Sequence, residues 1–145
     1  MTFLTLRREV DRFSDLAAGS PVVSGVVELG DQRGRTLGFP TANLAIGEGS
    51  ASDGVWAGWL QRGHEERYLA AISIGRRPTF YGRDGIRLLE AHVLDFAGDL
   101  YGSLVDVGLG MRIRSQRRFA SIDELVARLD LDIEETRRWG RSTAR

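Results

Sequence analysis

The residues best suited to chemistry lie between Gly25 and Asn43, where glycines, arginines and oxygen-bearing side chains are concentrated. Glycine tolerates positive φ and lets the backbone approach a ligand closely, so such a loop can turn its amides towards phosphate oxygens. Thr41 and Asn43 place two hard oxygen donors two residues apart, on one side of the chain if it is extended. Mg²⁺ takes few protein ligands and fills its remaining positions with water and nucleotide phosphates. The segment therefore predicts a magnesium-nucleotide site, and the alternative is a glycine-rich hairpin with a polar turn.

A second candidate is Glu90, a carboxylate in the middle of the apolar run from Leu88 to Leu94. Strand alternation places Glu90 and His92 on one face and the apolar residues between them on the other. A partly buried carboxylate aligned on a hydroxyl can accept its proton during phosphoryl transfer, which makes Glu90 a candidate general base. The alternative is a solvated outer face. His92 and His64 lack acidic or cysteine neighbours at ligand spacing, so we expect surface or hydrogen-bonded histidines rather than a metal pair.

Arginine-rich turns supply further candidates for binding phosphate. Arg76 and Arg77 follow an apolar strand end, and a second group precedes Phe119, formed by Arg112, Arg114, Arg117 and Arg118. A guanidinium group can bind phosphate oxygens through two parallel hydrogen bonds. Solvated turns would show the same composition, so both interpretations stay open from the residues alone.

Composition restricts the chemistry that these residues can perform. All 20 basic residues are arginine, and 20 acidic residues balance them. The lack of lysine excludes a Schiff-base lysine and the lysine of a P-loop, so phosphate chemistry must use backbone amides, arginine or a metal. The lack of cysteine excludes disulfides, thiol nucleophiles and thiolate metal sites.

Length and charge predict one cytoplasmic domain that acts on small molecules. The chain has 145 residues, of which 42% are hydrophobic, enough for a single core. Zero net charge argues against a general nucleic-acid binder. The chain has no apolar run of the about 18 residues that a membrane span needs, and no basic leader with a long apolar block. We therefore expect no nucleic-acid, membrane or obligate protein partner.

Hydrophobic periodicity predicts the elements that must position the candidate residues. A helical period predicts an amphipathic helix over residues 4–18, so that residues 1–20 form a helix and linker before a main domain at 21–145. Runs of β-branched and aromatic residues predict strands at 22–29, 55–60, 68–74, 86–94 and 104–114. Within the last run, the alternation from Val105 to Ile113 predicts one core-facing side and one side outside the core.

The helical period returns after Phe119, where Ser121 and Glu124 match a capping box. A second capping signal at Asp132 predicts either two short helices that bend near residues 130–132 or one kinked helix that runs to about Trp139. Five or six short strands followed by helix predict a mainly β protein with a small closed antiparallel barrel, because closure removes exposed strand edges.

The ordered motifs of the chain resemble those of the riboflavin kinase family. They are Gly25-x-Val27-x-x-Gly30-x-x-x-Gly34-Arg35-x-x-Gly38-Phe39-Pro40-Thr41-Ala42-Asn43, Ile74-Gly75-x-x-Pro78-Thr79-Phe80, Glu90-x-His92, Asp99-x-Tyr101-Gly102, and Arg114 with Phe119. The resemblance covers residues 22–139, and its G-F-P-T-A-N element is far more specific than a lone glycine motif. The chain is similar to the C-terminal kinase part of bifunctional riboflavin kinase/FAD synthetases, so the resemblance implies the kinase reaction without FAD synthesis.

The resemblance implies a six-stranded Greek-key barrel with a C-terminal helix that uses ATP and Mg²⁺ to phosphorylate the ribityl 5′-hydroxyl of riboflavin, giving FMN. It implies that Thr41 and Asn43 bind the metal and the phosphates, and that Glu90 accepts the proton of the hydroxyl. The loop over the nucleotide phosphates would contain Gly30, Gly34, Arg35 and Gly38. The flap beside the flavin would contain Arg114, Gln116 and Phe119.

Four residues depart from the family pattern, among them Arg76 and Ser115, which are not typical choices of the family. Ser73 stands where the family usually has asparagine, and Gln116 stands where glutamate is common. These departures motivate an alternative, a catalytically weak flavin-binding or regulatory module of the same fold. A kinase for a flavin analogue or another alcohol is a third interpretation.

Overall fold

Six antiparallel strands and one long helix form the part of the chain that the computed structural model describes, residues 20–28, 40–47, 51–77 and 86–143. In chain order these elements are β1 (Val22–Val26), β2 (Thr41–Ala45), β3 (Gly54–Arg62), β4 (Tyr68–Arg77), β5 (Ile86–Val93), β6 (Leu104–Arg114) and α3 (Ile122–Thr143). The helix predicted over residues 4–18 lies outside the described residues.

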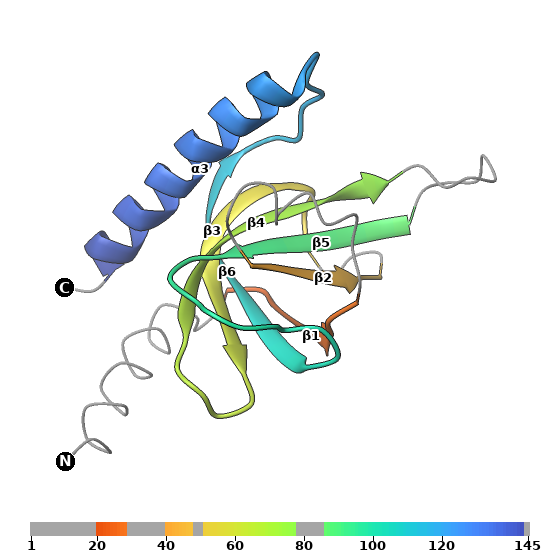
Figure 1. The fold of residues 1–145 in the computed structure, drawn as a ribbon, viewed down its shortest axis with the longest axis vertical. Helices are drawn as coiled ribbons and strands as arrows, with labels where there is room; N and C mark the ends of the chain where they lie inside the picture. The colour runs from red at the N-terminus through yellow and green to blue at the C-terminus, as the bar shows by residue number, and fades with distance from the viewer. Residues whose placement is uncertain (1–19, 29–39, 48–50, 78–85, 144–145) are drawn as a thin grey trace.

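The strands curl into a nearly closed barrel, and α3 lies across its outside (Figure 1). The strand order is β1-β6-β3-β4-β5-β2, with every neighbouring pair antiparallel. A backbone hydrogen bond of 2.8 Å from the Glu28 amide to the Asn43 carbonyl joins the chain after β1 to β2. This bond brings the two ends of the strand order together, so the predicted antiparallel barrel is confirmed.

The barrel core forms because apolar residues recur at every second position of the strands. Ala42 and Leu44 of β2 lie opposite Ala91 and Leu89 of β5, and all four side chains are buried. The core continues across the other strands with Val23, Leu60, Ile72, Ile74, Val105, Val107 and Leu109. The alternate positions of β2, β4 and β5 consequently face outwards, towards α3 and the space beside it.

A bulge in β6 divides the alternation that the sequence predicts for residues 105–113. Gly58 pairs with Leu109, but the preceding Ala57 pairs with Met111, so Gly110 is left over. Leu109 therefore lies in the core, whereas Met111 joins the row of Ala57 and Ala71 on the outer face. The prediction of a single core-facing side is wrong at Met111 and Arg112, because the extra residue shifts the period by one, and a second register shift returns Arg114 to the outer face.

The outer side of the barrel is also packed where glycines leave room for large rings. A Cβ built on Gly108 would overlap the Trp59 ring, and one built on Gly110 would overlap the Trp139 ring of α3. Trp59 is buried, with 4% of its surface exposed. The second face of β6, which the sequence places outside the core, is therefore packed in part, because indole rings lie against its two glycines.

The C-terminal segment is one helix rather than two. Ser121 caps its start, where the Glu124 amide donates to Ser121 Oγ over 3.2 Å, as the capping box predicts. Asp132 begins no new helix, because α3 runs unbroken from Ile122 to Thr143; its side chain is fully buried and pairs with an arginine of β6. Gly140 does not end the helix either. It packs so closely against Leu69 that a Cβ at this position would overlap the Leu69 side chain.

Candidate active site

The sheet register places three candidate residues of the sequence in one row. Asn43 of β2 lies directly opposite Glu90 of β5, and Glu90 lies directly opposite Ser73 of β4. The row continues through Val55 of β3 to Arg114 of β6. Residues directly opposite each other in an antiparallel pair project from the same face. Asn43 and Glu90 therefore lie side by side on the outer face of the barrel.

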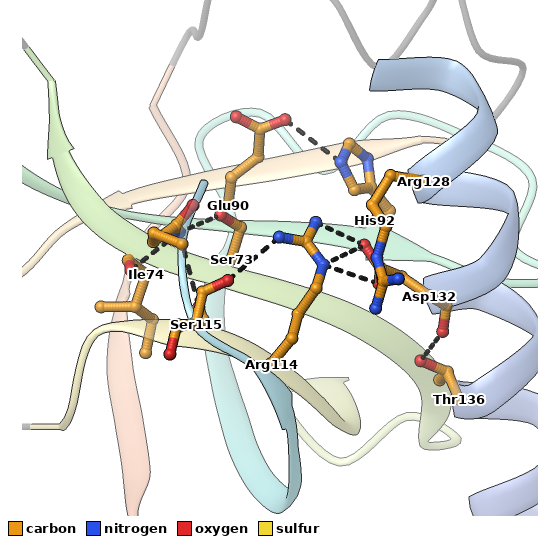
Figure 2. A network of polar contacts seen from close by, with 11 residues as sticks. Ser73, Ile74, Glu90, His92, Arg114, Ser115, Arg128, Asp132 and Thr136 are labelled. Atoms are coloured by element: carbon orange, nitrogen blue, oxygen red, sulfur yellow. Dashed lines mark hydrogen bonds and ion pairs between the residues drawn. The ribbon is translucent and has the colours of Figure 1, made fainter. Parts of the chain in front are cut away.

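Glu90 is buried, which rules out the alternative of a solvated outer face. Only 6% of Glu90 and 5% of His92 is exposed. His92 Nε2 lies 3.3 Å from Glu90 Oε1, and Figure 2 shows the two side chains turned towards each other. A buried carboxylate requires a positive or hydrogen-bonding neighbour to offset its lost hydration, and the imidazole supplies one. The sequence predicts a surface or hydrogen-bonded histidine at this position. The structure makes His92 part of the site.

Asn43 offers a donor atom that suits a cation. The residue is 6% exposed, and its Oδ1 has no hydrogen-bond partner among the residues that the structure describes. A buried amide oxygen without a partner is costly unless a ligand completes it. Thr41, two residues earlier on β2, lies opposite His92. The two side chains thus share one face, and their oxygens are of the kind that Mg²⁺ prefers, so the donor set fits the ion.

A pocket of about 1110 Å³ opens over this row. Its floor is the outer face of β4 and β5, where Ser73, Gly75, Glu90 and His92 line it. The opposite wall is apolar and consists of Ile122, Leu125, Val126 and Leu129 from the first half of α3. The volume lies slightly above the roughly 300–1,000 Å³ that is usual for small-molecule sites. The pocket therefore combines polar side chains on its floor with an apolar wall.

Arg114 joins the helix wall to the barrel. Its Nε and Nη2 donate to the two carboxylate oxygens of Asp132 over 2.9 and 2.7 Å (Figure 2). Arg128 Nε approaches the same carboxylate at 3.4 Å, and Thr136 Oγ1 donates to the Asp132 carbonyl over 2.8 Å. Asp132 is fully buried, so this pair fixes α3 against β6 at the edge of the pocket.

Residues 115–121, which we call the strap, connect β6 to α3 along one side of the pocket. Gln116 Nε2 donates to Ser73 Oγ over 2.7 Å and to the Ile74 carbonyl over 2.9 Å. Ser73 and Gln116, which both depart from the family pattern, therefore bind each other. Phe119 lies within cation-π distance of Arg114 and Arg117, whose guanidinium carbons are 5.7 and 5.4 Å from the ring centre.

A buried arginine fixes another edge of the pocket. Arg87, 7% exposed, donates from Nε to Asp53 Oδ1 over 2.8 Å and from Nη1 to the Gly47 carbonyl over 3.1 Å. It also bonds the Ala51 carbonyl. Because Asp53 lines the pocket, these bonds hold the approach to β3 in place.

Several residues that the sequence singles out cannot be placed. The predicted phosphate loop lies outside the described residues, namely Gly30, Gly34, Arg35 and Gly38. The described part of the chain does place Glu90, Asn43, Arg114, Gln116 and Phe119 around one pocket or in its row. The sequence analysis gave Asp132 no role in the site. The helical period does predict an apolar stripe on this helix, but nothing in the sequence assigned that stripe to the pocket.

Within the described ranges, no group of three or more His, Asp or Glu residues is arranged to hold a metal ion. A magnesium site formed by Thr41 and Asn43 needs no such cluster, since water and phosphates supply the remaining ligands. None of the helices in the described ranges combines the length and apolar character needed to cross a bilayer.

Comparisons with known proteins identify the family of the chain. The sequence profile of the flavokinase family, described as riboflavin kinase, matches residues 19–140. The bifunctional riboflavin kinase/FMN adenylyltransferase of Escherichia coli K12 is 45% identical over 112 residues, covering 76% of this chain and 35% of the relative. The Bacillus subtilis protein of the same name is 35% identical over 130 residues, covering 87% of this chain and 41% of the relative.

A solved structure shows the same fold. The crystal structure of riboflavin kinase from Trypanosoma brucei superposes with a TM-score of 0.58 at 28% identity, covering 81% of this chain and 78% of that one. The chain spans only about a third to two fifths of the two bifunctional relatives that it matches. The matched profile, the identities and the barrel together show that the chain belongs to the riboflavin kinase family.

Proposed function

We propose that this chain transfers the γ-phosphate of ATP to the 5′-hydroxyl of the ribityl chain of riboflavin, giving FMN and ADP. The observation that carries the proposal is the pairing of Asn43 with Glu90 in the sheet register, where Glu90 lines the pocket and Asn43 lies beside it on β2. This pairing puts an oxygen donor for a metal-bound nucleotide beside a buried carboxylate that can accept a proton. Membership of the riboflavin kinase family supports the choice of alcohol and phosphate donor.

Glu90 acts as the general base of the proposed reaction. As the 5′-oxygen of riboflavin attacks the γ-phosphorus, the bond from that phosphorus to the β,γ-bridging oxygen breaks, and ADP leaves with its electron pair. The hydroxyl proton passes to the carboxylate of Glu90. Because Glu90 lies on the pocket floor next to Asn43, the hydroxyl and the phosphate can meet there in line.

Thr41 and Asn43 would hold Mg²⁺ together with the nucleotide phosphates. When bound, the ion would offset the negative charge that builds up on the phosphates during transfer. The chain has no lysine for this purpose. We assign the remaining phosphate contacts to the glycine-rich loop, whose amides at Gly30, Gly34 and Gly38 would serve with the Arg35 guanidinium.

The apolar wall of α3 and the strap would bind the flavin ring. Leu125, Val126 and Leu129 face the pocket, and Phe119 lies at its edge. We assign Gln116 and Phe119 to direct flavin contacts. Arg114, also assigned to the flavin side, holds this wall in place through Asp132. ATP and riboflavin as the only partners, and a cytoplasmic location, belong to the same proposal.

The proposal is tested by incubating the chain with riboflavin, ATP and Mg²⁺ and measuring FMN by chromatography. The variant Glu90→Gln should lower kcat by about 10²- to 10⁴-fold, the usual contribution of a positioned base, with little change in riboflavin affinity. The matched control is Glu134→Gln, an exposed carboxylate on α3, which should turn over like the unchanged chain. Unchanged turnover in Glu90→Gln would refute the role of the base.

The same assay separates the main alternative. A flavin-binding or regulatory module would bind riboflavin, seen by quenching of flavin fluorescence, without forming FMN. Comparing riboflavin with flavin analogues and other alcohols as acceptors tests the third interpretation. We favour the kinase because Asn43 and Glu90 are both present and adjacent.

A further inference from the structure

His92 lies beside Glu90, the carboxylate that the proposed reaction uses. Glu90 and His92 are two residues apart on β5 and project from the same face. Their side chains are 8% and 6% exposed, and the distance from Nε2 to Oε1 is 3.3 Å. Figure 2 shows that the second carboxylate oxygen of Glu90 points away from the imidazole.

We propose that His92 is a positioning residue, whose Nε2 holds one oxygen of Glu90 so that the other faces the substrate hydroxyl. The inference rests on the proposed function and deepens it. A glutamate side chain has three rotatable bonds, and a base is effective only when its oxygen is held at the reacting proton. A contact at Oε1 restricts this freedom.

The sheet holds the imidazole in its place. His92 lies between Thr41 of β2 and Ala71 of β4 in the register, and the small side chain of Ala71 leaves space on one side. The ring lines the pocket next to Glu90. A contact of 3.3 Å is long for a hydrogen bond, and catalytic hydrogen bonds often tighten only when substrate is bound.

Three substitutions of His92 separate positioning from packing. The amide nitrogen of His92→Gln can occupy the place of Nε2, that of His92→Asn can reach only the place of Nδ1, and His92→Leu has no donor. We expect kcat to fall between about 10- and 100-fold in the Asn and Leu variants, the scale of a misplaced reacting group. His92→Gln should retain most of kcat, and the KM values for ATP and riboflavin should change little in all three.

A double-mutant cycle with Glu90→Gln shows whether His92 acts through the base. If it does, His92→Leu has no further effect on kcat once Glu90 has been replaced. Thermal unfolding is measured for each variant, so that kcat is compared only among folded proteins. Equal kcat in the unchanged chain, His92→Asn and His92→Leu would overturn the inference, as would equal losses in the Gln and Leu variants or full additivity in the cycle.

The two proposals fail in different ways. If the unchanged chain forms no FMN, the proposed function is wrong and the inference about His92 falls with it. If the unchanged chain forms FMN, Glu90→Gln is slow and the His92 variants are normal, the function stands and only the positioning role is wrong.

Discussion

The ion pair between Arg114 and Asp132 should be the main polar bond that holds α3 on the barrel. Asp132→Asn keeps the shape of the side chain and removes its charge. Asp132 is fully buried and the Arg114 side chain is 13% exposed, so the guanidinium would be left without its counter-charge in a place that water scarcely reaches. Breaking a buried pair in this way costs about 3–5 kcal/mol.

The amide oxygen of the substituted side chain still accepts one hydrogen bond, so we expect a loss near the lower limit, about 3 kcal/mol. For a chain of this size, each kcal/mol lowers Tm by roughly 2–4 °C, which gives a decrease of roughly 6–12 °C. Thermal and urea unfolding followed by circular dichroism measure this loss. Riboflavin affinity should also fall, because the apolar wall of the pocket is part of the same helix.

Asp95→Asn is the matched control, because Asp95 also joins the barrel to α3 through an arginine. Arg137 donates to its carboxylate over 3.0 and 3.3 Å, but the Asp95 side chain is 73% exposed. Exposed pairs contribute only about 0–1 kcal/mol. Asparagine also tolerates the left-handed backbone of this position, where φ is 58°.

The control has its own dependence on pH. The hydrogen bond from Arg137 lowers the pKa of Asp95 below its usual value of 3.8. A carboxyl group whose pKa is lower in the folded chain stabilises the fold above about pH 4 and loses this contribution as pH falls through the folded pKa. The small difference between Asp95→Asn and the unchanged chain should therefore vanish in acid. If Asp132→Asn costs no more than Asp95→Asn at about pH 7, Asp132 does not hold the helix and the reasoning is refuted.

The metal site and the glycine contacts of the barrel give two further predictions. Asn43→Ala should raise the Mg²⁺ concentration required for half-maximal FMN formation, because the variant lacks the buried Oδ1 that we assign to the ion. If the Mg²⁺ titration is unchanged, the ion binds elsewhere. Gly110→Ala should cost about 1–3 kcal/mol in urea unfolding, because its Cβ would overlap the Trp139 ring. Gly47→Ala, with open space around the added Cβ, should be nearly neutral, and equal losses in the two variants would contradict the packing argument.

The strand pattern was predictable from the sequence because burial of one face imposes a period of two. The predicted strands at 68–74, 86–94 and 104–114 correspond to β4, β5 and β6 within three residues at each end. β2 was harder, since a short Thr-Ala-Asn-Leu-Ala segment after Pro40 is compatible with strand or turn. The segment forms a strand because it pairs with β5. Pairing between segments that are distant in the chain leaves little trace in the local sequence.

The adjacency of Asn43 and Glu90 could be expected from the motifs, and the sheet register confirms it. The role of Asp132 was not predictable, because an aspartate shortly before Glu135 looks like a helix cap until Arg114 is known to lie opposite. The bulge at Gly110 was likewise hidden, since glycine at that position also suits an ordinary turn or an edge. His92 was underestimated because its partner, Glu90, is at strand spacing rather than at the spacing of metal ligands.

A crystal structure of the chain with Mg²⁺, ADP and FMN tests the central claim most directly. We predict the ion on Asn43 Oδ1 and Thr41, and the phosphate-bearing 5′-oxygen of FMN within roughly 2.6–3.2 Å of the Glu90 carboxylate, the reach of a general base. An ion and phosphate bound away from β2 and β5, with Glu90 facing neither the flavin nor the nucleotide, would contradict the account.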